Sequence, residues 1–125
     1  MKKALLIFAG ILCFCVIVFI VLVLRPIYNV TLEDSIKVSG EVSMIFENGK
    51  SYDISFRLKG DSNFYYINRG AQNGLDALAL NDSLQNKKIT LYYADHWTPL
   101  DPKGRVRHIT RVLYNEQLLY DEIKE

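Results

Sequence analysis

The sequence predicts a mainly β domain with one short helix, attached to a membrane by a single N-terminal transmembrane helix. Three features of the 125-residue chain support this prediction. The chain begins with a long apolar run, several later segments alternate apolar and polar residues, and one short segment between them has helical spacing. The length suits one domain beyond the membrane segment.

The transmembrane helix is predicted at Ala4–Leu24. These 21 residues contain no charge and no proline, and 16 of them are Leu, Ile, Val or Phe. As a helix the run is about 31 Å long, which matches the hydrocarbon core of a bilayer. Its insertion is favourable by about 5–10 kcal/mol. A buried core helix would need a polar stripe or a large partner domain, and the 101 residues that follow offer neither.

A cleaved signal peptide and a lipoprotein signal are the competing interpretations of this run. The run exceeds the ~7–15 apolar residues of a signal peptide, and no small-x-small cleavage pattern follows it. Bulky Leu12 and Phe14 precede Cys13 and Cys15, where lipoprotein processing needs small residues. We therefore expect an uncleaved signal anchor.

Charge predicts the orientation of the anchor. Lys2 and Lys3 precede the helix without an acidic neighbour, whereas the basic residues that follow it are offset by Glu33 and Asp34. The positive-inside rule then predicts a single-pass protein of the cytoplasmic (inner) membrane, with its domain on the periplasmic or extracellular side. The predicted segments are a cytoplasmic tail (1–3), the transmembrane helix (4–24), a linker (25–35) and an exported β domain (36–125).

The composition of the exported part limits its chemistry. Both cysteines lie in the anchor, so no disulfide can link parts of the domain. All fourteen acidic residues and thirteen of the fifteen basic ones follow the anchor, which leaves a net charge of about −1 there. Nucleic-acid-binding domains normally carry clustered excess basic charge, so the composition argues against that class.

Residues 36–46 and 52–58 alternate between apolar and polar with a period of two, so each is predicted to be a half-buried strand. Asn48-Gly49 favours a two-residue turn, but that register places Met44 opposite Asp53. A three-residue loop, Glu47–Gly49, keeps all apolar residues on one face, with Gly49 in the left-handed conformation. The pairs expected from this loop are Met44 with Tyr52, Val42 with Ile54 and Gly40 with Phe56.

Turn signals and apolar spacing delimit the remaining elements. Strands are predicted at 64–68, 88–94 and 106–114, a short helix at Leu75–Leu80, a long loop at Asp95–Gly104, and a sixth short strand at Gln117–Asp121. The predicted order is β-β-β-α-β-β, followed by that sixth strand.

This order resembles the OB-fold, a small five-stranded barrel with a helix between its third and fourth strands. The resemblance covers roughly residues 36–123 and lies in the order of elements. It implies that the loop Asp95–Gly104, between the fourth and fifth strands, borders a ligand surface. An open antiparallel sheet with one packed helix is the alternative architecture.

The loop Asp95–Gly104 is the strongest candidate site. Its ten residues are many for so small a domain, and they include His96 and the only tryptophan, Trp97. Tryptophan is enriched among the residues that dominate protein interfaces. Two interpretations are possible: Trp97 belongs to a binding surface, or it folds back as a lid over one end of the barrel.

Three arginines and two tyrosines complete the candidate binding residues. Arg107 and Arg111 would point the same way from one strand, with Arg105 beside them, and could grip an acidic protein, phosphate or lipid headgroups. The alternative is a solvated face paired with acidic residues across the sheet. In the pairs Tyr65-Tyr66 and Tyr92-Tyr93 one ring should enter the core, which leaves Tyr66 and Tyr92 for an outer surface.

Catalytic and cofactor signals are sparse. His96 and His108 are the only histidines, and neither has the spacing of a metal site. The sequence shows no nucleophile elbow and no glycine-rich phosphate loop, so we expect no catalytic residue, metal or cofactor.

The sequence therefore predicts a membrane-anchored, non-catalytic interaction module of the bacterial cell envelope. Its expected partners are the lipid bilayer, through the helix, and an envelope protein. One version is a protector (immunity-type) protein that neutralises a toxin arriving in the periplasm. The alternatives are an envelope hydrolase that uses Asp95 and His96, and a nucleic-acid-binding OB domain facing the cytoplasm.

Overall fold

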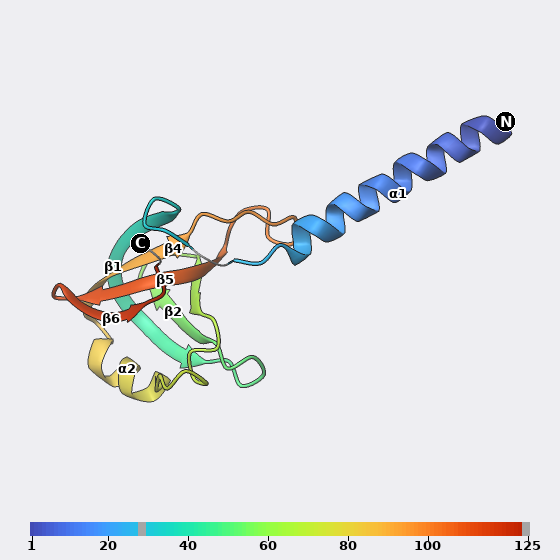
Figure 1. The fold of residues 1–125 in the computed structure, drawn as a ribbon. Helices are drawn as coiled ribbons and strands as arrows, with labels where there is room; N and C mark the ends of the chain where they lie inside the picture. Colours follow the sequence, from blue (N-terminus) through green and yellow to red (C-terminus); the bar gives the residue numbers. More distant parts are fainter. Residues whose placement is uncertain (28–29, 124–125) are drawn as a thin grey trace.

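The computed structural model describes residues 1–27 and 30–123, and shows a long helix that leads into a small β barrel (Figure 1). Two positions of the predicted linker, 28 and 29, and the last two of the predicted domain, 124 and 125, lie outside the described residues. The elements are α1 (Lys2–Leu24), β1 (Ser35–Glu47), β2 (Ile54–Leu58), β3 (Phe64–Ile67), α2 (Ala77–Leu84), β4 (Lys88–Ala94), β5 (Val106–Tyr114) and β6 (Gln117–Asp121).

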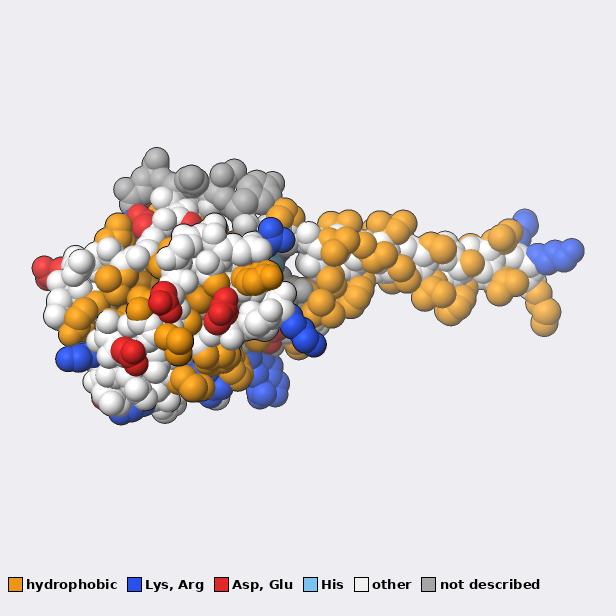
Figure 2. All heavy atoms as spheres, turned by 90° about the horizontal axis from the view of Figure 1, so that it is seen from below, with side chains coloured by type: hydrophobic (Ala, Val, Ile, Leu, Met, Phe, Trp, Pro, Cys, Tyr) orange, Lys and Arg blue, Asp and Glu red, His pale blue; other side chains and the backbone are white. Residues whose placement is uncertain are grey.

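The helix α1 contains the predicted run and starts two residues earlier, at Lys2. None of its residues is buried, and it is long and apolar enough to span a membrane. Apolar side chains cover its visible sides, with basic side chains at the far end (Figure 2). The helix ends at Leu24 because Arg25 precedes Pro26, and a residue before proline is pushed out of the helical region.

Five strands close the barrel. Antiparallel pairs join β3, β2, β1, β4 and β5 in that order, and a parallel pairing between β3 and β5 completes the circle. The first half of β1 pairs with β4 and its second half with β2, so β1 bends around the barrel. The sixth strand, β6, extends the sheet outside the circle by pairing with β5. The predicted fold class, mainly β with one short helix in the order β-β-β-α-β-β, is confirmed.

The predicted hairpin between the first two strands is wrong. Val42 lies opposite Leu58 and Met44 opposite Arg57, so Ser43 is an extra residue in β1. This bulge reverses the alternation: Val42 and Ile45 are buried, whereas Met44 is exposed. The connection is the longer segment 48–53, and it is Tyr52, not Gly49, that adopts positive φ.

The core fills the barrel with side chains from all five strands. Its largest fully buried members are Tyr65, Phe56, Ile54, Ile67, Ile89, Leu91 and Ile109. One end is closed by α2, which places Leu84 in the core and whose Asn81 side chain accepts a hydrogen bond from the Ile45 N–H at 2.8 Å. The helix begins later than predicted because the Asp76 side chain caps it by accepting the Leu78 and Ala79 N–H groups.

Candidate functional site

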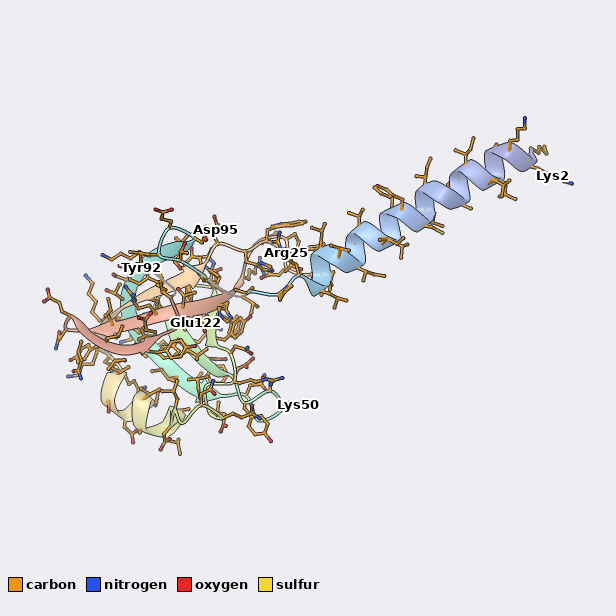
Figure 3. All side chains as sticks on the ribbon, in the orientation of Figure 1. Lys2, Arg25, Lys50, Tyr92, Asp95 and Glu122 are labelled. Carbon is orange, nitrogen blue, oxygen red and sulfur yellow. The ribbon has the colours of Figure 1, made fainter. Side chains whose placement is uncertain are left out.

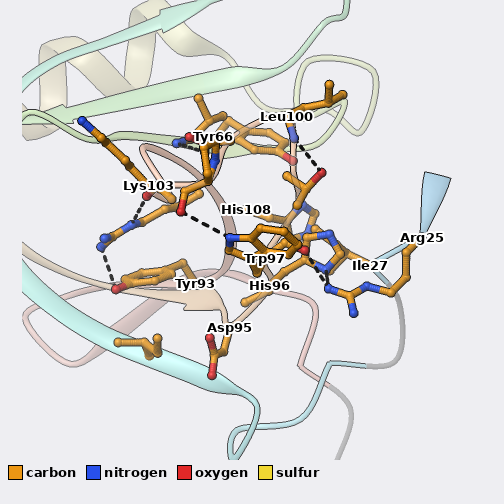
Figure 4. A pocket seen from close by; sticks show the side chains of 18 of the residues that line it. Arg25, Ile27, Tyr66, Tyr93, Asp95, His96, Trp97, Leu100, Lys103 and His108 are labelled. Atoms are coloured by element: carbon orange, nitrogen blue, oxygen red, sulfur yellow. Dashed lines mark hydrogen bonds between the residues drawn. The ribbon is translucent and has the colours of Figure 1, made fainter. Parts of the chain in front are cut away.

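A cavity of about 730 Å³, which we call the junction cavity, lies where α1 meets the barrel (Figure 4). This end of the barrel is opposite the one that α2 covers (Figure 1). Three parts of the chain line it: the end of α1 with residues 25–27, the β4–β5 loop (residues 95–105), and the barrel strands where they end. Val23, still within α1, belongs to the lining. The cavity therefore borders the apolar helix directly.

Arg25 joins the helix to the β4–β5 loop. Its Nη2 donates a hydrogen bond to the Trp97 carbonyl oxygen at 2.8 Å and lies 3.3 Å from Nδ1 of His96 (Figure 4). Because arginine only donates, His96 Nδ1 must act as the acceptor. Burial, the positive charge of Arg25 and the electrostatic effect of His108 lower the pKa of His96 below its ordinary value, which favours the neutral ring.

The β4–β5 loop is ordered by its own polar groups. The Asp101 carboxylate accepts the main-chain N–H groups of Arg105 at 3.0 Å and Val106 at 2.8 Å. The indole N–H of Trp97 donates to the Pro102 carbonyl oxygen at 3.3 Å. These bonds hold Trp97 at the cavity with 50% of its surface exposed, outside the buried core of the barrel.

Arg107 forms part of the barrel wall of the cavity. Its Nη1 donates to the Tyr93 hydroxyl at 2.7 Å and its Nε to the Gly104 carbonyl oxygen at 2.7 Å. The guanidinium also lies over the Tyr93 ring, 4.5 Å from its centroid. Such a cation–π contact is stronger where water is excluded. Arg107 is therefore held in place by the protein before any ligand binds.

A polar cluster around His108 on β5 borders the same cavity, which both His108 and Tyr66 line. His108 is buried, pairs through Nε2 with the Glu122 carboxylate, and has the Tyr66 ring at right angles to its own, 5.4 Å between centroids. The Tyr120 hydroxyl donates to Glu122 at 2.6 Å. Burial acts to raise the pKa of Glu122, but the hydrogen bonds from His108 and Tyr120 outweigh it and hold the pKa below its ordinary value.

The structure brings four of the seven candidate residues together. Tyr66, His96, Trp97 and Arg107 all line the junction cavity, whereas Arg105, Arg111 and Tyr92 do not. As expected, one tyrosine of each pair is buried, namely Tyr65 and Tyr93. Asp95 also borders the cavity, and its N–H donates to the Asp34 carbonyl oxygen.

The expectation that Arg107 and Arg111 share one face is wrong. Tyr92 lies opposite Arg111 and Tyr93 opposite Ile109, so Thr110 is an extra residue in β5 and reverses the alternation after it. Arg111 instead pairs with Asp121 at 3.1 Å and lies over the Tyr92 ring. That contact agrees with the alternative interpretation of the arginines, in which they pair with acidic residues across the sheet and do not form a binding surface.

Sequence reasoning missed Arg25, Lys103 and His108 as parts of the site. Arg25 and Lys103 lie 78 positions apart, and no local pattern links them. The position of Arg25 directly after the apolar run was the one available signal. Within residues 1–27 and 30–123, no group of three or more His, Cys, Asp or Glu side chains is arranged to hold a metal ion.

An exposed sheet face lies beside the cavity. Met44 lies opposite Arg57, the Arg57 guanidinium lies 4.0 Å above the Phe64 ring centroid, and Phe64 lies opposite Val106. Met44, Phe64 and Val106 are 40–56% exposed, although their strands are paired. Because Val106 also lines the junction cavity, this row, which we call the outer row, leads into it.

Comparisons of the chain with protein-family models, with curated proteins and with solved structures found no match.

Proposed function

We propose that this chain is a single-pass membrane protein whose OB-like barrel is a non-catalytic interaction module. In this proposal α1 crosses the cytoplasmic membrane of a bacterium, with residues 1–3 inside and the barrel outside. Lys2 and Lys3, directly before the apolar run, support that orientation. The closed five-strand circle with α2 between β3 and β4 supports the OB-like assignment.

The observation that carries the interaction function is the outer row. Met44, Phe64 and Val106 are large apolar side chains left exposed on strands that are already paired, with the Arg57 guanidinium among them. Contiguous apolar surface with an arginine and a polar rim is typical of protein interfaces. OB barrels also commonly use the face of their second and third strands for ligands.

The proposed partner is an envelope protein that binds the outer row. The proposed site therefore lies on strands β1, β2, β3 and β5, at the outer row. It is not the predicted set Arg105, Arg107 and Arg111, because the bulge at Thr110 turns Arg107 and Arg111 to different faces. A protector protein that captures a toxin in the periplasm is one form of this function. Its support is the proposed topology, which puts the barrel on the side of the membrane where such a toxin arrives.

Site-specific photo-crosslinking in cells tests this proposal on the full-length chain. A crosslinking residue at Met44 or Val106 should give one discrete protein adduct. The control position is Leu78 on α2, a single exposed apolar residue 79% accessible and outside the outer row. Protein adducts that are missing at Met44 and Val106, or equally strong at Leu78, would refute the outer row as a partner surface.

The hydrolase alternative has weaker geometric support. His96 Nδ1 is occupied by Arg25, and Asp95 is held by its main chain to Asp34. A His96→Ala chain that keeps its fold and its cellular activity would eliminate this alternative.

A further inference from the structure

The β4–β5 loop lies at the level where the proposed membrane span ends. Arg25, the first residue after α1, bonds to His96 and Trp97, and Val23 of α1 lines the same cavity as Trp97 and Leu100. The headgroup layer of a bilayer extends about 5–8 Å beyond its hydrocarbon core on each side. A loop hydrogen-bonded to the residue after the span therefore falls within that layer.

The tip of this loop exposes apolar side chains. Leu100 is 69% exposed and Trp97 is 50% exposed, and both belong to the segment beside α1 (Figure 4). The exposure of these apolar surfaces to water is unfavourable. Tryptophan is enriched at membrane interfaces, because its apolar ring and polar N–H suit the boundary between lipid and water. The indole N–H of Trp97 already has an acceptor in Pro102, so the ring can enter the interface without losing a hydrogen bond.

Three basic residues lie in the β4–β5 loop or are hydrogen-bonded to it. Arg25, Lys103 and Arg105 form no ion pair with a carboxylate among residues 1–27 and 30–123. Within the loop, the Asp101 carboxylate is engaged by two main-chain N–H groups. Unpaired cations beside exposed aromatic and aliphatic side chains suit the phosphates of anionic phospholipids.

We propose that the β4–β5 loop is a second membrane contact, which inserts Trp97 and Leu100 into the headgroup layer of an anionic bilayer while Arg25, Lys103 and Arg105 face the phosphates. The junction cavity then opens onto lipid headgroups. The barrel takes one fixed orientation, with the outer row left accessible to a partner. This inference rests on the membrane anchoring in the proposed function and is independent of the protein partner.

Trp97 makes the test direct, because it is the only tryptophan in the chain. The full-length protein is reconstituted in phosphatidylcholine vesicles with or without phosphatidylglycerol, and tryptophan emission is recorded with lipids brominated at shallow or deep acyl positions. We expect blue-shifted emission that shallow bromines quench more than deep ones, and stronger quenching when phosphatidylglycerol is present. Water-soluble acrylamide should quench weakly.

Two matched pairs of charge variants test whether the basic residues of the loop cause the stronger quenching in phosphatidylglycerol. Lys103→Gln with Arg105→Gln should lower the ratio of inserted to detached loop in phosphatidylglycerol vesicles by roughly fivefold for each charge removed. The control pair is Lys87→Gln with Lys88→Gln, at the start of β4 and roughly 20 Å along that strand from the loop. The control should leave quenching unchanged.

Two outcomes would overturn the inference. One is emission from vesicle-bound protein that acrylamide quenches fully and brominated lipids do not. The other is an equal effect of both charge pairs. Flotation of the vesicles separates this failure from failure of the anchor. Protein that floats with the vesicles, but whose Trp97 emission brominated lipids do not quench, refutes only the loop contact. Protein that does not float refutes the anchoring as well.

Discussion

The Arg25 guanidinium donates a hydrogen bond to the Trp97 carbonyl oxygen at 2.8 Å, across 72 positions of the sequence. Arg25 is the first residue after α1, and Trp97 lies in the loop between β4 and β5. A side chain next to the apolar helix is thus bonded to one end of the barrel (Figure 3, where Arg25 is labelled at the end of α1). The same guanidinium reaches His96, so two bonds define the junction.

Loss of the Arg25 side chain should loosen the β4–β5 loop. In Arg25→Gln we expect amide hydrogen exchange across residues 95–105 to rise about two- to tenfold, because each net hydrogen bond contributes about 0.5–1.5 kcal/mol. Hydrogen exchange with mass spectrometry on the reconstituted protein measures this. Lys37→Gln, a change on β1 outside the cavity lining, is the control. Unchanged exchange in Arg25→Gln would contradict the role given to this contact.

The junction should weaken at acidic pH. Burial and the neighbouring charges put the pKa of His96 below its ordinary 6.5 in the folded state. The unfolded state then binds more protons, so the junction is fully stable above about pH 6.5 and loses stability as the pH falls below that value. Trp97 emission followed from pH 8 to pH 5 should report the change. In His96→Gln, which keeps an acceptor and has no titratable ring, the profile should be flat, and a profile like that of the parent would exclude His96 as its cause.

Glu122 should stabilise the fold at neutral pH and less so in acid. Its carboxylate accepts from Tyr120 and pairs with His108, and its pKa is held below 4.5, so its contribution is present above that value and disappears as the pH falls through the lowered pKa. Glu122→Gln should reduce the free energy of unfolding by about 1–3 kcal/mol at pH 7. Urea unfolding in detergent micelles, followed by the near-ultraviolet circular dichroism of the tyrosines, measures this at pH 7 and pH 3. An equal deficit at both values would show that the charge is not the cause.

Gly70 should tolerate no side chain. A Cβ there would lie 2.5 Å from Cγ1 of Ile54, a fully buried core residue, so Gly70→Ala should destabilise the barrel by about 1–3 kcal/mol. Gly49→Ala, where a Cβ would meet nothing within 4 Å, is the matched control and should change stability little. The same unfolding assay compares them, and equal stability of the two variants would refute the packing at Gly70.

The extents of several barrel strands could be predicted from the sequence, but not all of their facing. The bounds of β4, β5 and β6 agree with those predicted, because each is an apolar-rich segment flanked by turn residues. The prediction failed where one extra residue, Ser43 or Thr110, reverses the alternation, since a bulge leaves no mark in a period-two pattern.

The candidate site was predicted only in part, because it is formed by segments that lie far apart in the sequence. Loop length and the single tryptophan identify the β4–β5 loop. The contact of Arg25 with that loop depends on where the closed barrel places the two segments, and this information is absent from any local window of sequence. The outer row was missed because Met44 was expected to face the core.

The orientation of the chain decides which partners and which bilayer leaflet the barrel can reach. Two full-length fusions measure it directly: one carries a C-terminal reporter active only outside the cytoplasm, and the other a reporter active only inside. A barrel outside the cytoplasmic membrane predicts activity of the first fusion alone. Activity of the second fusion alone would contradict the proposed topology and, with it, the envelope partner.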